Sequence, residues 1–185
     1  MKALLPILFL LLTTWSLGQV QELPNGNFED WKKRDHFKPS SYYSPTRNVL
    51  RTEDAKTGKY ALKLVNTYIE NSRGTRSYIR NIDANSSLRG FDFQDDPLSL
   101  VFWSKHDLAE HDTARVYVRF NYQGGYKGAV DFRFTGSTND EWVKYSVPIN
   151  WNGARTPDTV LMYFYSYAEY GVDGDGWVIF DDVHF

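Results

Sequence analysis

One stretch decides the fold class: Ala114-Arg115-Val116-Tyr117-Val118-Arg119-Phe120-Asn121-Tyr122-Gln123. Its apolar side chains fall at every second position, and polar or aromatic side chains lie between them. Strict alternation of this kind predicts a β-strand with one buried face. Gly124-Gly125 follows as a turn, and residues 129–134 repeat the alternation, so the two segments are predicted to form a hairpin.

Similar short patterns extend over the rest of the chain, and helical periodicity is hard to find beyond the N-terminal segment. Further strands are predicted at residues 61–65, 77–82, 98–106, 141–149, 159–168 and 176–185, with others near residues 28 and 48–51. About nine to ten short strands without crossover helices indicate an all-β fold, a two-sheet antiparallel β-sandwich of the jelly-roll type. Residues 32–46, which contain two prolines, are predicted to form a long surface loop.

The first 18 residues are typical of a signal peptide. Lys2 precedes the apolar segment 3–12, and Ser16-Leu17-Gly18 resembles a cleavage site. The apolar run is shorter than the ~20 residues that span a bilayer. We therefore expect residues 19–185 to form one exported domain, periplasmic or extracellular. Because the chain has no cysteine and Gln19 follows the predicted cleavage site, neither disulfides nor a lipid anchor on cysteine are expected.

Composition argues against several functions. The formal net charge is −2 and no basic block is present, so neither nucleic acid nor membrane insertion is expected. The four histidines lack metal-ligand spacing, and no nucleophile-elbow motif occurs, so the domain is expected to be non-catalytic. Aromatic residues make up 17% of the chain, which suits both strands and stacking surfaces.

The two ends of the predicted domain carry neighbouring carboxylates. Residues 25–31 and 178–185 contribute Glu29, Asp30, Asp181 and Asp182. If the terminal strands meet, these groups could surround one hard cation. With Ile179 and Val183 pointing inward, Asp181 is predicted to point inward too, where a carboxylate must be paired or bound to metal. The alternative is that Glu29 and Asp181 accept hydrogen bonds from turn amides.

Three motifs in order suggest a family: residues 24–31 (Pro-Asn-Gly-Asn-Phe-Glu-Asp-Trp), 57–62 (Thr-Gly-Lys-Tyr-Ala-Leu) and 179–183 (Ile-Phe-Asp-Asp-Val). Together they resemble carbohydrate-binding β-jelly-rolls of galactose-binding-like topology, in particular jelly-roll proteins exported by Bacteroidota. The resemblance implies sugar binding and a structural calcium between the terminal strands. Its ligands would be the carboxylates of Glu29 and Asp181 and backbone oxygens near Asn27 and from Thr57 to Lys59, consistent with the oxygen ligands that calcium prefers.

The polar sides of the strands supply candidate ligand-binding residues. Sugar C–H groups pack on aromatic rings, and sugar hydroxyls form hydrogen bonds with arginine and aspartate. Strand parity suggests that one face collects Trp103, Tyr117, Arg119, Asp131, Arg133, Tyr163 and Tyr165. Cross-strand aromatic pairs also stabilise sheets without any ligand, so the same pattern is compatible with a purely structural face.

The leading hypothesis is a secreted module that binds a polysaccharide or oligosaccharide through this face. One alternative is an envelope or extracellular module whose tyrosines bind a protein partner. A third is a glycan-cleaving jelly roll, which requires two carboxylates about 5–9.5 Å apart on one face.

Overall fold

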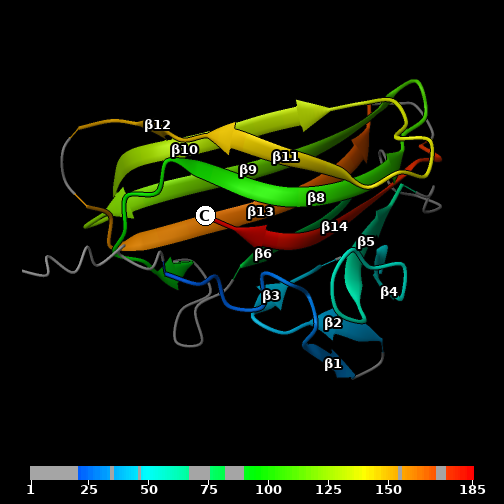
Figure 1. Cartoon of the computed structure of the whole chain (residues 1–185), viewed down its shortest axis with the longest axis horizontal. Coiled ribbons are helices and arrows are strands. Elements are labelled where there is room, and N and C mark those ends of the chain that lie inside the picture. The colour runs from blue at the N-terminus through cyan, green and yellow to red at the C-terminus, as the bar shows by residue number, and fades with distance from the viewer. Residues whose placement is uncertain are drawn as a thin grey trace, which may run out of the picture.

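The computed structural model describes residues 21–33, 36–45, 47–66, 76–81, 90–153, 156–169 and 174–185 (Figure 1). The described residues form fourteen strands and no helix, and every strand pair is antiparallel. The predicted all-β sandwich is therefore confirmed, with more strands than expected. Among these residues no helix is long and apolar enough to cross a membrane. The predicted signal peptide, residues 1–18, lies outside the described residues.

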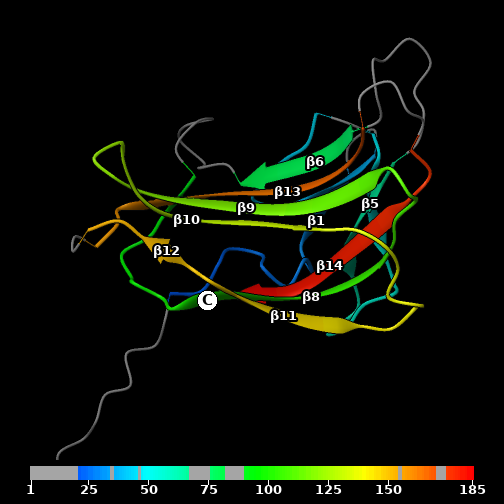
Figure 2. The ribbon, with the colours of Figure 1, turned by 90° about the horizontal axis from the view of Figure 1, so that it is seen from above.

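The larger layer is a seven-stranded sheet. Its main path runs β12 (Asn150–Trp151), β10 (Gly125–Phe134), β9 (Asp112–Tyr122), β13 (Thr159–Ala168), β6 (Arg76–Asn81) and β3 (Tyr42–Tyr43), and the short β7 (Phe91–Asp92) also pairs with β13. Viewed along the layers in Figure 2, β9 dips between its two ends, so the outer side of this sheet is concave along the strands.

The second layer is a five-stranded sheet, in the order β11 (Val143–Pro148), β8 (Ser99–Asp107), β14 (Trp177–His184), β5 (Ala61–Val65) and β4 (Val49–Thr52). It lies below the seven-stranded sheet in Figure 2. A separate ribbon joins β1 (Trp31–Lys33) to β2 (Phe37–Pro39).

Aromatic residues fill the space between the layers. Phe164 of β13 meets Phe180 of β14 with ring centroids 5.0 Å apart, and both side chains are fully buried. Val116, Val118 and Phe120 are also fully buried, as the alternation in β9 predicts. Burying each such side chain contributes about 1.5–3 kcal/mol to folding, so this layer of rings holds the sandwich together without disulfides.

Two expectations about the N-terminal region are wrong. Residues 32–46 do not form one surface loop, because they include β2 and β3, and Tyr42 is buried beside Phe164. Phe28 is not in a strand either. It lies in a turn with a φ of 51° and is fully buried against Tyr42 and Phe164. Burial of these aromatic rings outweighs the turn-like local sequence.

Candidate functional site

The outer side of the seven-stranded sheet carries a two-dimensional array of tyrosine and arginine. In β9 the residues that alternate with the buried core set are Arg115, Tyr117 and Arg119, and the register places Tyr165, Tyr163 and Leu161 of β13 directly opposite them. On the other side of β13, β6 contributes Arg76, Tyr78 and Arg80. We call this surface the tyrosine–arginine face; it consists of Arg76, Tyr78, Arg80, Arg115, Tyr117, Arg119, Asp131, Arg133, Tyr163 and Tyr165.

Four tyrosines form a continuous path across three strands of this face. The ring centroids of Tyr78 and Tyr165 are 5.6 Å apart. Tyr165 stacks on Tyr163 at 5.4 Å with an interplanar angle of 4°, and Tyr163 lies 6.2 Å from Tyr117. With strands about 4.8 Å apart, the path crosses roughly 10 Å of sheet. The partly exposed rings of Tyr78, Tyr163 and Tyr117 are therefore available to an extended ligand, with the buried ring of Tyr165 connecting them.

Arginines lie on both sides of this tyrosine path. The Arg76 guanidinium carbon is 5.0 Å from the ring centroid of Tyr78 and 4.8 Å from that of Tyr165. On the β9 side, the guanidinium carbon of Arg115 lies 5.0 Å from the Tyr117 ring centroid. Cation–π contacts of this kind add about 0.5–1 kcal/mol at exposed sites and hold the guanidinium planes against the rings.

Asp131 of β10 adds a carboxylate to the face. It accepts two hydrogen bonds from Arg115, from Nε to Oδ1 at 2.6 Å and from Nη2 to Oδ2 at 2.7 Å. Arg133 Nε is 3.6 Å from the same Oδ1. The hydrogen bonds from Arg115, which outweigh partial burial, lower the pKa of Asp131 below its usual value. The carboxylate is therefore ionised at neutral pH and cannot serve as a proton donor there.

Tyr165 is the most buried ring of the face, with 9% of its surface exposed. This burial raises the pKa of Tyr165, and the guanidinium groups of Arg76 and Arg115 oppose the effect. The phenol is therefore neutral and able to donate a hydrogen bond.

The structure brings six of the seven predicted ligand-binding residues together on this face: Tyr117, Arg119, Asp131, Arg133, Tyr163 and Tyr165. Trp103 does not join them. It lies in β8 of the other sheet, where the Lys56 ammonium group is 4.1 Å from its ring centroid. Parity alone fixes the side of a strand on which a residue lies but not the sheet to which the strand belongs, and this is why Trp103 was misplaced.

Four face residues were not predicted to bind a ligand. Arg115 of β9 is one, and the other three lie in β6: Arg76, Tyr78 and Arg80. The signal was present in β6, because these three alternate with Ser77, Ile79 and Asn81, all of which are buried. A strand was predicted there, but its polar side could not be assigned to the face without knowing that β6 pairs with β13.

The two ends of the domain do meet, as expected. The Val183 amide donates to the carbonyl oxygen of Gly26 at 2.9 Å. Asp30 and Asp182 line a pocket at this junction. Glu29 and Asp181 contact a different segment, the loop that leads into β5.

This loop binds both carboxylates through its backbone amides. Asp181 Oδ2 accepts from the amides of Lys56 and Thr57 at 2.7 and 2.8 Å. Glu29 Oε1 accepts from Lys59 and Tyr60 at 2.7 and 2.9 Å. These contacts match the alternative in which turn amides bind the carboxylates. We call residues 53–60, Glu29 and Asp181 the loop clasp.

The predicted inward orientation of Asp181 is wrong. Its neighbour Phe180 belongs to the core, and Asp181 pairs with Trp103, so it lies on the outer side of the five-stranded sheet. A register shift after Asp181, with a φ of 48° at Asp182, then returns Val183 to the core. Asp181 is nevertheless fully buried, because the loop covers it. Burial raises its pKa, although three backbone amides act in the opposite direction.

The residues of the loop clasp do not present an oxygen cage in this arrangement. Thr57 and Lys59 direct N–H groups at the carboxylates, and the second oxygen of Asp181 accepts the amide of Asp182 at 2.7 Å. Asn27 Oδ1 faces the amide of Glu29 at 3.4 Å. The described residues include no group of three or more histidines, aspartates or glutamates placed to hold a metal. Calcium prefers six to eight oxygens, so this geometry does not fit it, and calcium stays a prediction of the resemblance alone.

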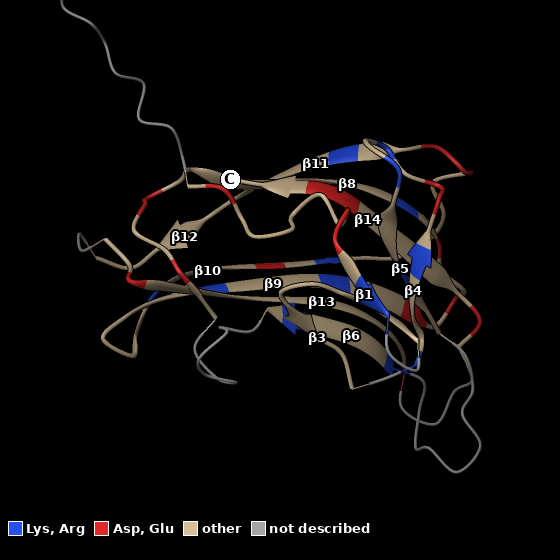
Figure 3. Ribbon diagram, turned by 90° about the horizontal axis from the view of Figure 1, so that it is seen from below, with Lys and Arg blue, Asp and Glu red and all other residues tan. Residues whose placement is uncertain are grey.

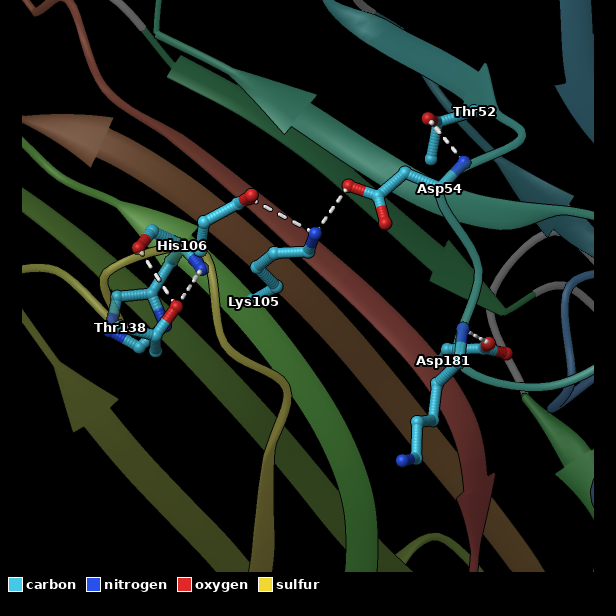
Figure 4. Close-up of polar contacts among 8 residues, drawn as sticks. Thr52, Asp54, Lys105, His106, Thr138 and Asp181 are labelled. Carbon is cyan, nitrogen blue, oxygen red and sulfur yellow. Dashed lines mark hydrogen bonds and ion pairs between the residues drawn. The ribbon is translucent and has the colours of Figure 1, made fainter.

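A buried lysine also fixes this loop. Lys105 Nζ lies 2.8 Å from Asp54 and 3.0 Å from Asp140, and Figure 4 shows its side chain directed towards Asp54. The two buried charged groups of this sheet, Lys105 and Asp181, are thus each matched to specific partners.

Comparisons with known proteins define the fold. No protein-family model matches this chain, and no curated protein matches its sequence. An arabinose-bound MgGH51 α-L-arabinofuranosidase is similar with a TM-score of 0.53 and 11% identity, over 89% of this chain and 26% of that one. The enzymatically active domain of bacteriophage CBA120 tailspike protein 4 is similar with a TM-score of 0.51 and 13% identity, over 89% of this chain and 21% of that one. TmCBM61 in complex with β-1,4-galactotriose has a TM-score of 0.44 and 13% identity, over 86% of this chain and 90% of that one.

For the first two proteins the similarity concerns the fold alone, and this chain spans between a fifth and about a quarter of their lengths.

Proposed function

We propose that this protein is an exported, non-catalytic carbohydrate-binding module whose binding surface is the tyrosine–arginine face. The observation that carries the proposal is the tyrosine path. Four rings lie in contact across β6, β13 and β9, on the concave outer side of the larger sheet (Figure 2).

The chemistry of the face suits a sugar chain. The C–H surface of a pyranose packs on a tyrosine ring, while its hydroxyl groups form hydrogen bonds at the ring edges. Arg119, whose Nε donates to Asn121 at 2.8 Å, and the paired Arg115 and Asp131 provide fixed polar groups beside the path. Because the neighbouring contacts already order these side chains, little conformational entropy is lost when a ligand binds.

Two observations favour binding over cleavage on this face. Among the described outward positions of β6, β9, β10 and β13, Asp131 is the one carboxylate, whereas glycoside hydrolysis uses a pair. In addition, Arg115 lowers the pKa of Asp131, and a carboxyl group with a lowered pKa is unsuited to act as a general acid.

The decisive experiment compares residues on the two sheets. We expect the purified domain to bind at least one polysaccharide in affinity electrophoresis or calorimetry, with a dissociation constant between micromolar and millimolar. Tyr163→Ala and Tyr117→Ala should each weaken binding at least fivefold. Trp103→Ala, the matched control on the other sheet, should leave it unchanged. Loss of binding only in the Trp103 variant would move the site to the five-stranded sheet, and no binding to a broad glycan panel would reject the function.

Export and calcium are separate parts of the proposal. Export is tested by locating the processed protein in the native host, where the N-terminus of the mature chain should follow residue 18. Calcium is tested by melting the protein with and without a chelator. If the chelator lowers the melting temperature and added calcium restores it, the metal is supported. If the melting temperature does not change, the amide contacts of Glu29 and Asp181 are sufficient to explain how the loop clasp is held.

A further inference from the structure

The tyrosine–arginine face carries far more positive charge than the molecule as a whole. The chain has a net charge of −2. On the central strands of the face, however, one carboxylate, Asp131, accompanies five arginines: Arg76, Arg80, Arg115, Arg119 and Arg133. Asp92 of β7 lies at one end, opposite Thr159. Figure 3 shows the basic positions along β9 and β10 and the single acidic segment of β10.

Most of this positive charge is not neutralised within the described part of the chain. There, Asp131 pairs with Arg115 and lies near Arg133, and no ion pair involves Arg76, Arg80 or Arg119. The Nε of Arg80 is buried without a hydrogen-bond partner, although the same guanidinium lies 5.2 Å from the Tyr43 ring centroid. A buried donor without an acceptor is destabilising, and an acceptor that reached it would remove that cost.

The arrangement of the arginines matches one kind of ligand group. A guanidinium in contact with a ring still has N–H groups that can donate to a ligand, and guanidinium groups bind carboxylate or sulfate oxygens through two parallel hydrogen bonds. Because the path crosses the strands, the register places Arg76 and Arg115 along one side of it and Arg80 and Arg119 along the other. A sugar chain stacked on the tyrosines would therefore place its substituents between two rows of arginine.

We propose that the glycan bound by this face is an acidic polysaccharide, one whose sugar units carry carboxylate or sulfate groups. This inference rests on the proposed function. It adds that stacking on the tyrosine path supplies the sugar contact, while the arginine rows select for negative charge.

The test uses matched pairs of polymers that differ only in charge. Binding of the domain is measured by calorimetry to polygalacturonate and to the same polymer after carboxyl reduction. A second arm compares a sulfated galactan with its desulfated form, and the two arms distinguish carboxylate from sulfate. We expect at least a tenfold preference for one acidic polymer over its neutral counterpart, and this preference should decrease at high salt.

Variants connect the preference to the arginines. Arg80→Gln combined with Arg119→Gln should remove most of the preference and leave weak binding to the neutral polymer. Lys144→Gln, a cation on the outer side of the other sheet whose Nζ is 5.9 Å from the Trp103 ring centroid, is the control and should retain the preference.

Each outcome has a distinct meaning. Equal affinity for acidic and neutral polymers would overturn the inference and leave the carbohydrate-binding function intact. No binding to either polymer or to other glycans would reject the proposed function itself. Binding to single-stranded DNA as tight as to the acidic polymers would overturn the inference as well, because the face would then select charge without sugar.

Discussion

The outer faces of the two sheets differ in the charged groups that they bury. On the five-stranded sheet, Asp181 and Lys105 are buried and each has specific partners, three amides for the first and two carboxylates for the second. On the seven-stranded sheet, arginines lie over tyrosine rings, and among the described residues most have no acidic partner. We therefore expect substitutions of the buried charges on the first face to reduce the stability of the fold, and substitutions on the second face to reduce ligand affinity.

The largest effect is expected at Asp181. Asp181→Asn leaves three backbone N–H groups facing an amide with a single acceptor oxygen, and unsatisfied buried donors are costly. We expect the free energy of unfolding in urea to fall by about 3 kcal/mol. The control is Asp182→Asn, next in sequence and half-exposed, which should change stability by less than about 0.5 kcal/mol. Equal losses in the two variants would show that the loop clasp does not hold the fold together.

A smaller effect is expected at Gly58, where the loop clasp requires glycine for two reasons. Its φ is 63°, and an added Cβ would collide with the carboxylate of Glu29. Gly58→Ala should lower the unfolding free energy by about 2 kcal/mol, since a left-handed residue costs roughly 1–2 kcal/mol before any collision.

Gly136→Ala separates the two causes, because Gly136 has a φ of 82° and open space around it. It should show the conformational cost alone. In a Glu29→Ala background the cost of Gly58→Ala should fall towards that of Gly136→Ala. If it does not fall, the contact between Gly58 and Glu29 is unimportant.

The two faces also differ in how well the sequence predicts them. The strict alternation of β9 and of residues 129–134 is local, and it placed Tyr117, Arg119 and Asp131 on the correct face. The assignment of Trp103 depended on which strands share a sheet, and β8 pairs with β11 and β14 instead of β9. Likewise, the bulge at Asp182 reverses which residues of β14 point inward, and no local sequence pattern indicates that a bulge occurs there.

The loop clasp was half predictable for a related reason. Carboxylates at both ends of the domain were visible in the sequence, and the ends do meet. Whether a loop covers them with amide N–H groups or with carbonyl oxygens depends on backbone orientation between residues 56 and 60, and side-chain types do not encode that orientation.

The smallest effect is expected at Asp131, the best-paired charge of the tyrosine–arginine face. Its pair with Arg115 is bidentate, but 43% of the Asp131 side chain is exposed, so solvent screens the interaction. Asp131→Asn should therefore cost only about 0.5 kcal/mol at pH 7. Because Arg115 lowers the folded pKa of Asp131, the contribution is complete above the unfolded pKa, near 3.8, and is lost as the pH falls through the folded value.

Urea titrations of Asp131→Asn and the unmodified protein should then differ at pH 7 and converge at pH values below that window. If the loss at pH 7 were as large as that of Asp181→Asn, the tyrosine–arginine face would be a structural surface, and the division between the two faces would fail. If the loss is small while affinity for an acidic glycan changes, the arginines of this face are positioned for a ligand, because their pairing within the protein contributes too little to stability to explain their arrangement.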